Sequence, residues 1–139
     1  MLVLDTNVYL DADHDSAFGR RLAAYLAGRR DPVGLSSVVV AELLVGVATA
    51  DERRRFLTAT LDAVPAARVL TPTQADWQMA GDALSQLGGD AATRGRSFWN
   101  DLLIAASCAR AGATLLTRNT EDFRRIRRVI AVAVELRPA

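Results

Sequence analysis

The chain has 139 residues, half of them hydrophobic, and a formal net charge of +1. This length has room for one hydrophobic core, so we expect a single domain over residues 1–139. All 17 basic residues are arginines, and the absence of lysine excludes a lysine-dependent phosphate-binding loop and Schiff-base catalysis. One cysteine, Cys108, excludes an intrachain disulfide and a multi-cysteine zinc site. With a single histidine, His14, and no G-x-S-x-G motif, a Ser-His-Asp hydrolase is disfavoured.

The N-terminal sequence predicts no export or membrane insertion. An acid, Asp5, follows the first four residues, and no basic segment precedes a long apolar stretch, so we expect no secretory signal. The longest apolar run, residues 38–48, is interrupted by Glu42 and is shorter than the roughly 20 residues that span a bilayer. We therefore expect a cytoplasmic protein with no membrane partner.

Short apolar runs alternate along the chain with helix-like segments. In chain order we predict a strand Leu2–Leu4, a helix Phe18–Gly28, a strand Val33–Leu35, a helix capped by Ser36 and Ser37 that runs to about Ala48, a helix Asp51–Ala63, a strand Val69–Leu70, a helix Thr73–Leu87, a break at Gly88 and Gly89, a helix Phe98–Ala111 stopped by Gly112, a strand Thr114–Thr117 and a strand Val129–Leu136. This alternation predicts an α/β fold with a short parallel β-sheet flanked by helices, in which ligands bind outside the carboxyl ends of the strands.

Glu42 is the most informative single residue of the sequence. Its neighbours at helical spacing are Val38, Val39, Val45 and Gly46, so its carboxylate lies on an apolar face. An ionised carboxylate there is costly unless a cation or hydrogen-bond donors compensate it. We therefore expect a compensating group to face Glu42. The alternatives are a helix exposed at this point or a buried pair with an arginine.

Three aspartates are ordinary one by one but informative together. Asp5 directly follows a predicted strand and can cap a helix, Asp101 is predicted in the first turn of a helix, and Asp122 is predicted in a polar turn over residues 118–122. With Glu42 they would meet at one end of the sheet, where each like-charged pair at 4 Å costs about 4 kcal/mol at an effective dielectric near 20. Mg²⁺ or Mn²⁺ would relieve this repulsion and suits hydrolysis of a phosphodiester by activated water.

The segments around these acids, Leu4–Asn7, Ser37–Gly46, Asn100–Ala106 and Leu116–Phe123, resemble the four acidic blocks of PIN-domain ribonucleases, in particular the VapC-type toxins. The resemblance covers Leu2 to about Val134 and agrees in order and spacing. It implies a PIN-like fold and a metal-dependent endoribonuclease. In that reading Asp5 and Asp101 are the most direct metal ligands, Glu42 and Asp122 act directly or through water, and Thr6, Thr117 and Asn119 orient the acids.

The resemblance also implies partners. VapC-type toxins cut RNA, form homodimers and are neutralised by a cognate VapB-like antitoxin that covers the acidic site. Two alternatives stay open at this point. One is a PIN-type nuclease of RNA processing without an antitoxin, and the other is a non-catalytic acidic α/β domain that binds a metal or a protein. A response-regulator receiver is disfavoured because it uses a lysine near its site.

A net charge of +1 means that any RNA footprint must be local. Candidates are Arg94 and Arg96 before the Asp101 segment, Arg118, and a group after the last acid that comprises Arg124, Arg125, Arg127 and Arg128. Of these we single out Arg96, Arg118 and Arg124 as RNA contacts. The alternative for the 124–128 group is a solvated face paired with Glu121 or Glu135.

Several other features are interpreted as structural. The cluster of Asp11, Asp13, His14 and Asp15 reads as a polar loop between helices, and residues 53–55 read as a solvated arginine face. Cys108 is expected in the core. Trp77 and Trp99 are expected to pack rather than to stack on bases.

Overall fold

The computed structural model describes residues 1–88 and 95–136. Its sheet has the strand order β3-β2-β1-β4-β5, and every neighbouring pair is parallel. The strands are β1 Leu2–Leu4, β2 Val33–Ser36, β3 Val69–Leu70, β4 Thr114–Thr117 and β5 Ala133–Leu136. The α/β class and the parallel sheet predicted from the sequence are confirmed. Gly89 and Arg94, named above, lie outside the described residues.

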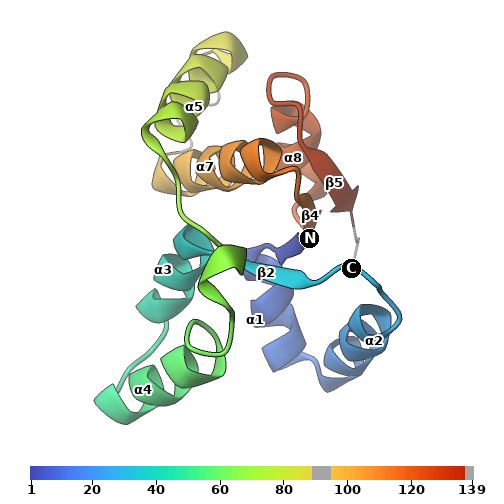
Figure 1. Ribbon diagram of the computed structural model, residues 1–139. Helices are drawn as coiled ribbons and strands as arrows, with labels where there is room; N and C mark the ends of the chain where they lie inside the picture. The colour runs from blue at the N-terminus through green and yellow to red at the C-terminus, as the bar shows by residue number, and fades with distance from the viewer. Residues whose placement is uncertain (89–94, 137–139) are drawn as a thin grey trace.

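Helices cover both faces of this sheet (Figure 1). They are α1 Thr6–His14, α2 Ser16–Ala27, α3 Ser37–Val45, α4 Ala50–Ala59, α5 Gln74–Leu87, α7 Arg96–Ala111 and α8 Thr120–Ile126, with a 3-10 turn η1 Ala66–Arg68. Helices α1 and α2 lie on one side of the sheet and α5, α7 and α8 on the other (Figure 1).

The first strand shows why the sheet is enclosed. Leu2 and Leu4 pack into the cluster with residues of α1 and α2, whereas Val3 packs into the larger cluster with α7. Successive side chains of a strand point to opposite faces, so an all-apolar strand needs cover on both. Helix α7 supplies most of the cover on its side, since residues 101–108 are all buried. Polar side chains are therefore left to the ends of the strands.

Some boundaries differ from the sequence prediction. The supposed loop over residues 11–15 is wrong, because α1 continues to His14 and Asp15 caps α2 by accepting hydrogen bonds from the amides of Ala17 and Phe18. Helix α4 ends at Ala59 rather than Ala63, and β5 begins at Ala133 rather than Val129.

Two differences affect the acids. Residues 120–126 form α8, a helix that the sequence did not predict, so Asp122 lies in its first turn rather than in an irregular turn. Helix α7 begins at Arg96, which puts Asp101 beyond the first turn of that helix. None of the helices in residues 1–88 and 95–136 combines the length and the apolar character needed to cross a bilayer.

Candidate active site

Asp5 stands at the junction of β1 and α1. It follows the buried strand directly, caps α1 through a hydrogen bond from the Thr6 amide to Oδ1 at 2.8 Å, and is 3% exposed. Its other oxygen, Oδ2, accepts from Thr117 Oγ1 at 2.6 Å. Burial raises the pKa of Asp5 and the charge of Glu42 adds to the rise, while the hydrogen bonds from Thr117 and Thr6 oppose it. Asp5 therefore differs from an ordinary exposed helix cap, because burial and the charge of Glu42 disfavour its ionised form.

Asn7 belongs to the same corner and was not among the site residues predicted from the sequence. Its Nδ2 donates to Asp5 Oδ2 at 3.3 Å and lies 3.4 Å from Thr117 Oγ1, and its Oδ1 accepts from the Arg118 amide at 3.1 Å. Asn7 thus ties the start of α1 to the end of β4. The sequence held one signal for this role of Asn7. The residue lies two positions after Asp5, in the first turn of the helix that follows the strand.

Glu42 receives its compensating group from Thr6. Thr6 Oγ1 donates to Glu42 Oε1 at 2.7 Å, which joins α1 to α3 across 36 residues of sequence. Glu42 is partly buried, and within the described residues no arginine pairs with it. The expectation of a facing group is confirmed. A neutral hydroxyl leaves the negative charge of Glu42 in place, however, so this donor holds the carboxylate without neutralising it.

Asp101 and Asp122 are linked by a single side-chain amide. Asn119 caps α8 by accepting from the Asp122 amide at 3.3 Å, and its Nδ2 donates to Asp122 Oδ2 at 3.1 Å and to Asp101 Oδ2 at 3.4 Å. Asp101 is 6% exposed. Burial, and then the charges of Asp5, Glu42 and Asp122, raise the pKa of Asp101 to about 8.

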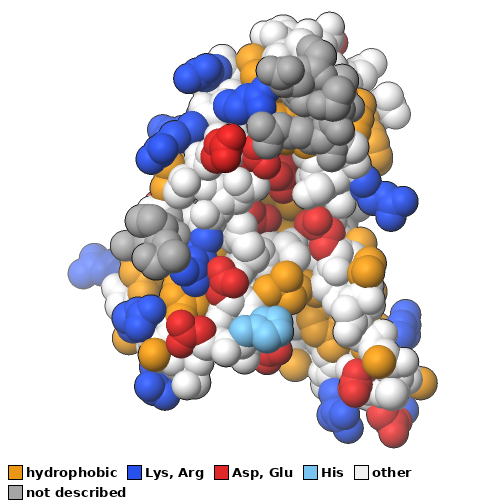
Figure 2. Space-filling model, turned by 180° about the vertical axis from the view of Figure 1, so that it is seen from behind, with side chains coloured by type: hydrophobic (Ala, Val, Ile, Leu, Met, Phe, Trp, Pro, Cys, Tyr) orange, Lys and Arg blue, Asp and Glu red, His pale blue; other side chains and the backbone are white. Residues whose placement is uncertain are grey.

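The four acids predicted from the sequence therefore act on one another electrostatically. They come from the end of β1, from α3 and α7, and from the first turn of α8, four pieces of chain that are separate in sequence. In the space-filling view, acidic side chains gather around a hollow on one face, with arginines on the surface to both sides (Figure 2). Asp101 is the acid whose pKa is raised by all three of the others.

The donor set fits a hard divalent cation in chemistry. Its ligands are carboxylate oxygens, the type that Mg²⁺ and Mn²⁺ prefer, and the site has an excess of negative charge that such an ion would compensate. In the part of the chain that the structure describes, no three of these side chains are yet drawn closely enough around one point to hold an ion as they stand. The binding of a cation would therefore require these side chains to move closer together.

The three arginines predicted as RNA contacts differ in their surroundings. Arg96 and Arg124 are exposed, at the start of α7 and on α8, and neither has an ion-pair partner among the described residues. Arg118 is held instead: its Nη1 lies 3.1 Å from Asp11 Oδ2 and its guanidinium 4.2 Å from the centre of the Phe18 ring. The side chain of Arg118 is only 16% exposed, so it ties β4 to the α1–α2 hairpin.

Cys108 and the two tryptophans, interpreted from the sequence as packing residues, differ in how far they are buried. Cys108 is fully buried, and burial raises the pKa of its thiol to about 12, so it is an inert core residue. Trp77 and Trp99 contact each other between α5 and α7 with ring centres 6.5 Å apart, although Trp77 stays half exposed. Glu135, offered above as a partner of the 124–128 arginines, pairs with Arg29 at 2.9 Å.

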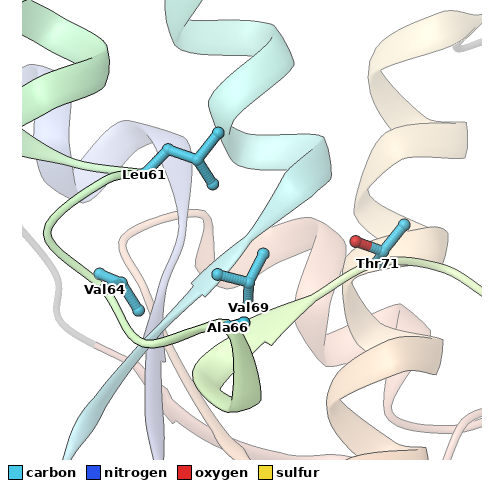
Figure 3. Close-up of a pocket in the computed structure, with 5 residues that line it drawn as sticks. All are labelled: Leu61, Val64, Ala66, Val69 and Thr71. Atoms are coloured by element: carbon cyan, nitrogen blue, oxygen red, sulfur yellow. The ribbon is translucent and has the colours of Figure 1, made fainter.

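A second hollow lies away from the acids. It has a volume of about 420 Å³ and is lined by Leu61, Val64, Ala66, Val69 and Thr71, at the connection between α4 and β3 (Figure 3). Its lining carries no titratable side chain, and the Thr71 hydroxyl is engaged with Ser37 Oγ at 2.6 Å. This second hollow therefore lacks the acidic groups that characterise the first one.

Comparison with known proteins agrees with this geometry. The PIN domain family model matches residues 2–129. Among solved structures, FitAB bound to an IR36 DNA fragment is similar with a TM-score of 0.69 and 26% identity, covering 98% of this chain and 94% of the other. FitAcB from Neisseria gonorrhoeae gives a TM-score of 0.66 and 26% identity, covering 99% and 98%. VapBC-5 from Mycobacterium tuberculosis, a member of the VapBC family of toxin-antitoxin systems, is similar with a TM-score of 0.57 and 29% identity. The match covers 99% of this chain and 97% of the other. No curated protein matches the sequence significantly.

The family model covers nearly the whole chain, so the chain belongs to the PIN domain family. The resemblance drawn from the four acidic segments is confirmed at the level of family and fold. PIN nucleases in general use divalent metal ions, which agrees with the chemistry of the donor set described above.

Proposed function

We propose that this protein is a Mg²⁺- or Mn²⁺-dependent endoribonuclease toxin of the VapC type. The observation that carries the proposal is the convergence of four acids: Asp101 is 6% exposed, the Asn119 side chain joins it to Asp122, and Asp5 and Glu42 lie close enough to raise its pKa. A fold gains no stability from such a group, so its presence points to a positively charged ligand. Membership of the PIN domain family supports a nuclease.

Each residue near the acids has a definite task in this proposal. Asp5 and Asp101 hold the cation most directly, with Glu42 and Asp122 beside them. When bound, the divalent ion supplies Lewis-acid chemistry, activating water and stabilising charge on the scissile phosphate. Asp101 gives up its proton as the cation binds, so binding strengthens as the pH rises towards 8.

The neighbouring polar groups keep the acids in place. Thr117 and Asn7 hold Asp5 Oδ2, Thr6 holds Glu42, and the Asn119 amide spans Asp101 and Asp122. A set of carboxylates that repel one another needs such donors, because otherwise the side chains would turn apart. The role proposed from the sequence for Thr6, Thr117 and Asn119 is supported by these contacts.

The substrate and partners follow from the same proposal. We take RNA as the substrate, with Arg96 and Arg124 as exposed cations able to contact its phosphates. We retain Arg118 as a weaker candidate, since contact with RNA would compete with its pairing to Asp11. The relatives in the VapBC family form toxin-antitoxin systems, which supports a VapB-like antitoxin as the partner of this chain. A homodimer is part of the same proposal.

The test is cleavage of a mixed cellular RNA pool by purified, antitoxin-free protein. We expect discrete cuts with Mg²⁺ or Mn²⁺ and none with EDTA. Asp101→Asn should lower the cleavage rate by about 1,000-fold, because it removes the central anionic ligand. Asp82→Asn, the same chemical change at an exposed position on α5, serves as the matched control and should cut like the wild type.

Two results would overturn the proposal. A folded wild-type protein that cuts no RNA with either metal would remove the nuclease assignment. An Asp101→Asn protein as active and as metal-dependent as the wild type would remove the assignment of the acidic site.

A further inference from the structure

Helices α7 and α8 pack against each other near the acids, and two pairs of side chains meet across that contact. In the first pair, Asp101 of α7 and Asp122 of α8 share the Asn119 amide. In the second pair, the Arg125 guanidinium of α8 lies over the Phe98 ring of α7, 5.9 Å from its centre.

The two pairs are one helical turn apart on both helices. Phe98 precedes Asp101 by three residues, and Arg125 follows Asp122 by three residues. Residues three apart share one face of a helix, with Cβ atoms about 5–6 Å apart. Arg125 therefore lies on the side of α8 that carries Asp122, one helical turn further along the helix. Arg124, the next residue back, is exposed on a different side of the helix.

The surroundings of Arg125 are unusual for this protein. Its side chain is partly buried, and no acid of the described residues lies within ion-pair distance of it. The other partly buried arginines have polar partners in the described residues: Arg29 pairs with Asp31 and Glu135, Arg118 pairs with Asp11, and Arg68 donates to the Val33 carbonyl at 3.3 Å. A partly buried guanidinium without a carboxylate is costly unless a ligand completes it. Two structural roles are the alternatives to a ligand. Arg125 covers the Phe98 ring, and its positive charge lies favourably near the C-terminal end of α8.

We propose that Arg125 binds the RNA phosphate next to the scissile one. The inference rests on the proposed ribonuclease function and deepens it by assigning a substrate-binding residue. The planar guanidinium matches the oxygens of a phosphate with two parallel hydrogen bonds. Its displacement of one helical turn from the acids places it at the adjacent phosphate, while the scissile phosphate lies at the acids. A cation one helical turn from Asp122 also offsets the repulsion between four carboxylates and the RNA backbone.

The experiment measures binding and cleavage separately. Binding of a short fluorescein-labelled single-stranded RNA of mixed sequence is followed by anisotropy in EDTA, at several salt concentrations, and cleavage is followed with Mg²⁺. Arg125→Met keeps an apolar side chain over Phe98 and removes the charge. Arg53→Met makes the same change at an exposed position on α4 and is the control.

We expect Arg125→Met to weaken RNA binding about tenfold at low salt and to flatten the plot of log affinity against log salt by about 0.7, the value of one lost phosphate contact on a single strand. KM should rise by a similar factor with kcat within about twofold. Arg53→Met should leave the salt slope unchanged. Arg125→Lys keeps the charge and should keep the slope while binding a few fold more weakly, because it lacks the planar fork.

A structural role would give a different pattern. If Arg125→Met lowered the melting temperature and kcat but left the salt slope equal to that of Arg53→Met, the proposal would be overturned while RNA cleavage by the wild type upheld the nuclease. If the wild type neither bound nor cut RNA, both the Arg125 proposal and the ribonuclease proposal would be overturned. Should Arg125→Met not fold, Arg125→Lys decides: affinity equal to the wild type contradicts the paired contact.

Discussion

Two buried aspartates on adjacent helices have opposite surroundings. Asp76 of α5 is 1% exposed, accepts from the Thr73 amide at 2.8 Å and pairs with Arg110 Nε at 3.0 Å. Asp101 of α7 is 6% exposed, has one long hydrogen bond from Asn119 at 3.4 Å, and is repelled by three acids. Burial alone therefore does not mark a functional acid in this protein. Within residues 1–88 and 95–136 no cation pairs with Asp101, and this distinguishes it from an acid that holds two helices together.

The comparison predicts that removing the charge of Asp101 stabilises the metal-free protein. The pKa of Asp101 is about 8 in the folded state and near 3.8 when unfolded, so the folded state holds more protons between these values. Stability then falls as the pH rises from about 4 to about 8. Asp101→Asn should lack this fall and be more stable in EDTA at pH 8 by a few kcal/mol. Denaturant unfolding of both proteins at pH 5 and pH 8 measures this difference. A wild-type advantage at pH 8 would contradict it.

Breaking the pair at the other aspartate should have the opposite sign. Arg110→Ala leaves the Asp76 carboxylate buried with only its hydrogen bond from the Thr73 amide, and should destabilise the fold by about 2 kcal/mol, reduced because Arg110 is 38% exposed. The control is Arg54→Ala, which breaks an exposed pair with Asp51 and should cost less than about 1 kcal/mol. Urea unfolding compares the two. Equal losses would mean that the Asp76 pair is no more than a surface contact.

The smallest effect concerns the groups that hold the acids. Thr117→Val keeps the buried shape but removes the hydroxyl that donates to Asp5 Oδ2 and accepts from the backbone N–H of Asn119. We expect the Mn²⁺ concentration for half-maximal cleavage to rise about tenfold, as for other groups that orient metal ligands. Thr114→Val, at the other end of β4, is the matched control. A metal requirement equal in the two variants would show that Thr117 serves only packing.

Much of the fold was readable from the sequence because the strands are short, apolar and enclosed. The strands β1 and β4 were predicted with the observed bounds, since Leu2–Leu4 and Thr114–Thr117 must be buried on both faces. Helix α8 was missed because it has only seven residues, and its apolar positions Phe123 and Ile126 are too few to show a period. The prediction of a loop over residues 11–15 was wrong for a related reason. The charged residues there belong to a helix in which Val8 is the only fully buried residue, so the apolar period is too weak to recognise.

The sequence by itself determined which acids are present and in what order. It also determined the local contacts of two of them, because Asp5 accepts from the next amide and the Asp122 amide donates to Asn119 three residues earlier. Only the tertiary structure decided their partners. Thr6 meets Glu42 across 36 residues and Thr117 meets Asp5 across 112, which no local pattern encodes. The packing of α7 on α8 likewise set Arg125 over the Phe98 ring and left Arg124 exposed. The charge of a residue is fixed by its type, but its pKa and its ligand depend on what the fold brings within a few ångströms of it.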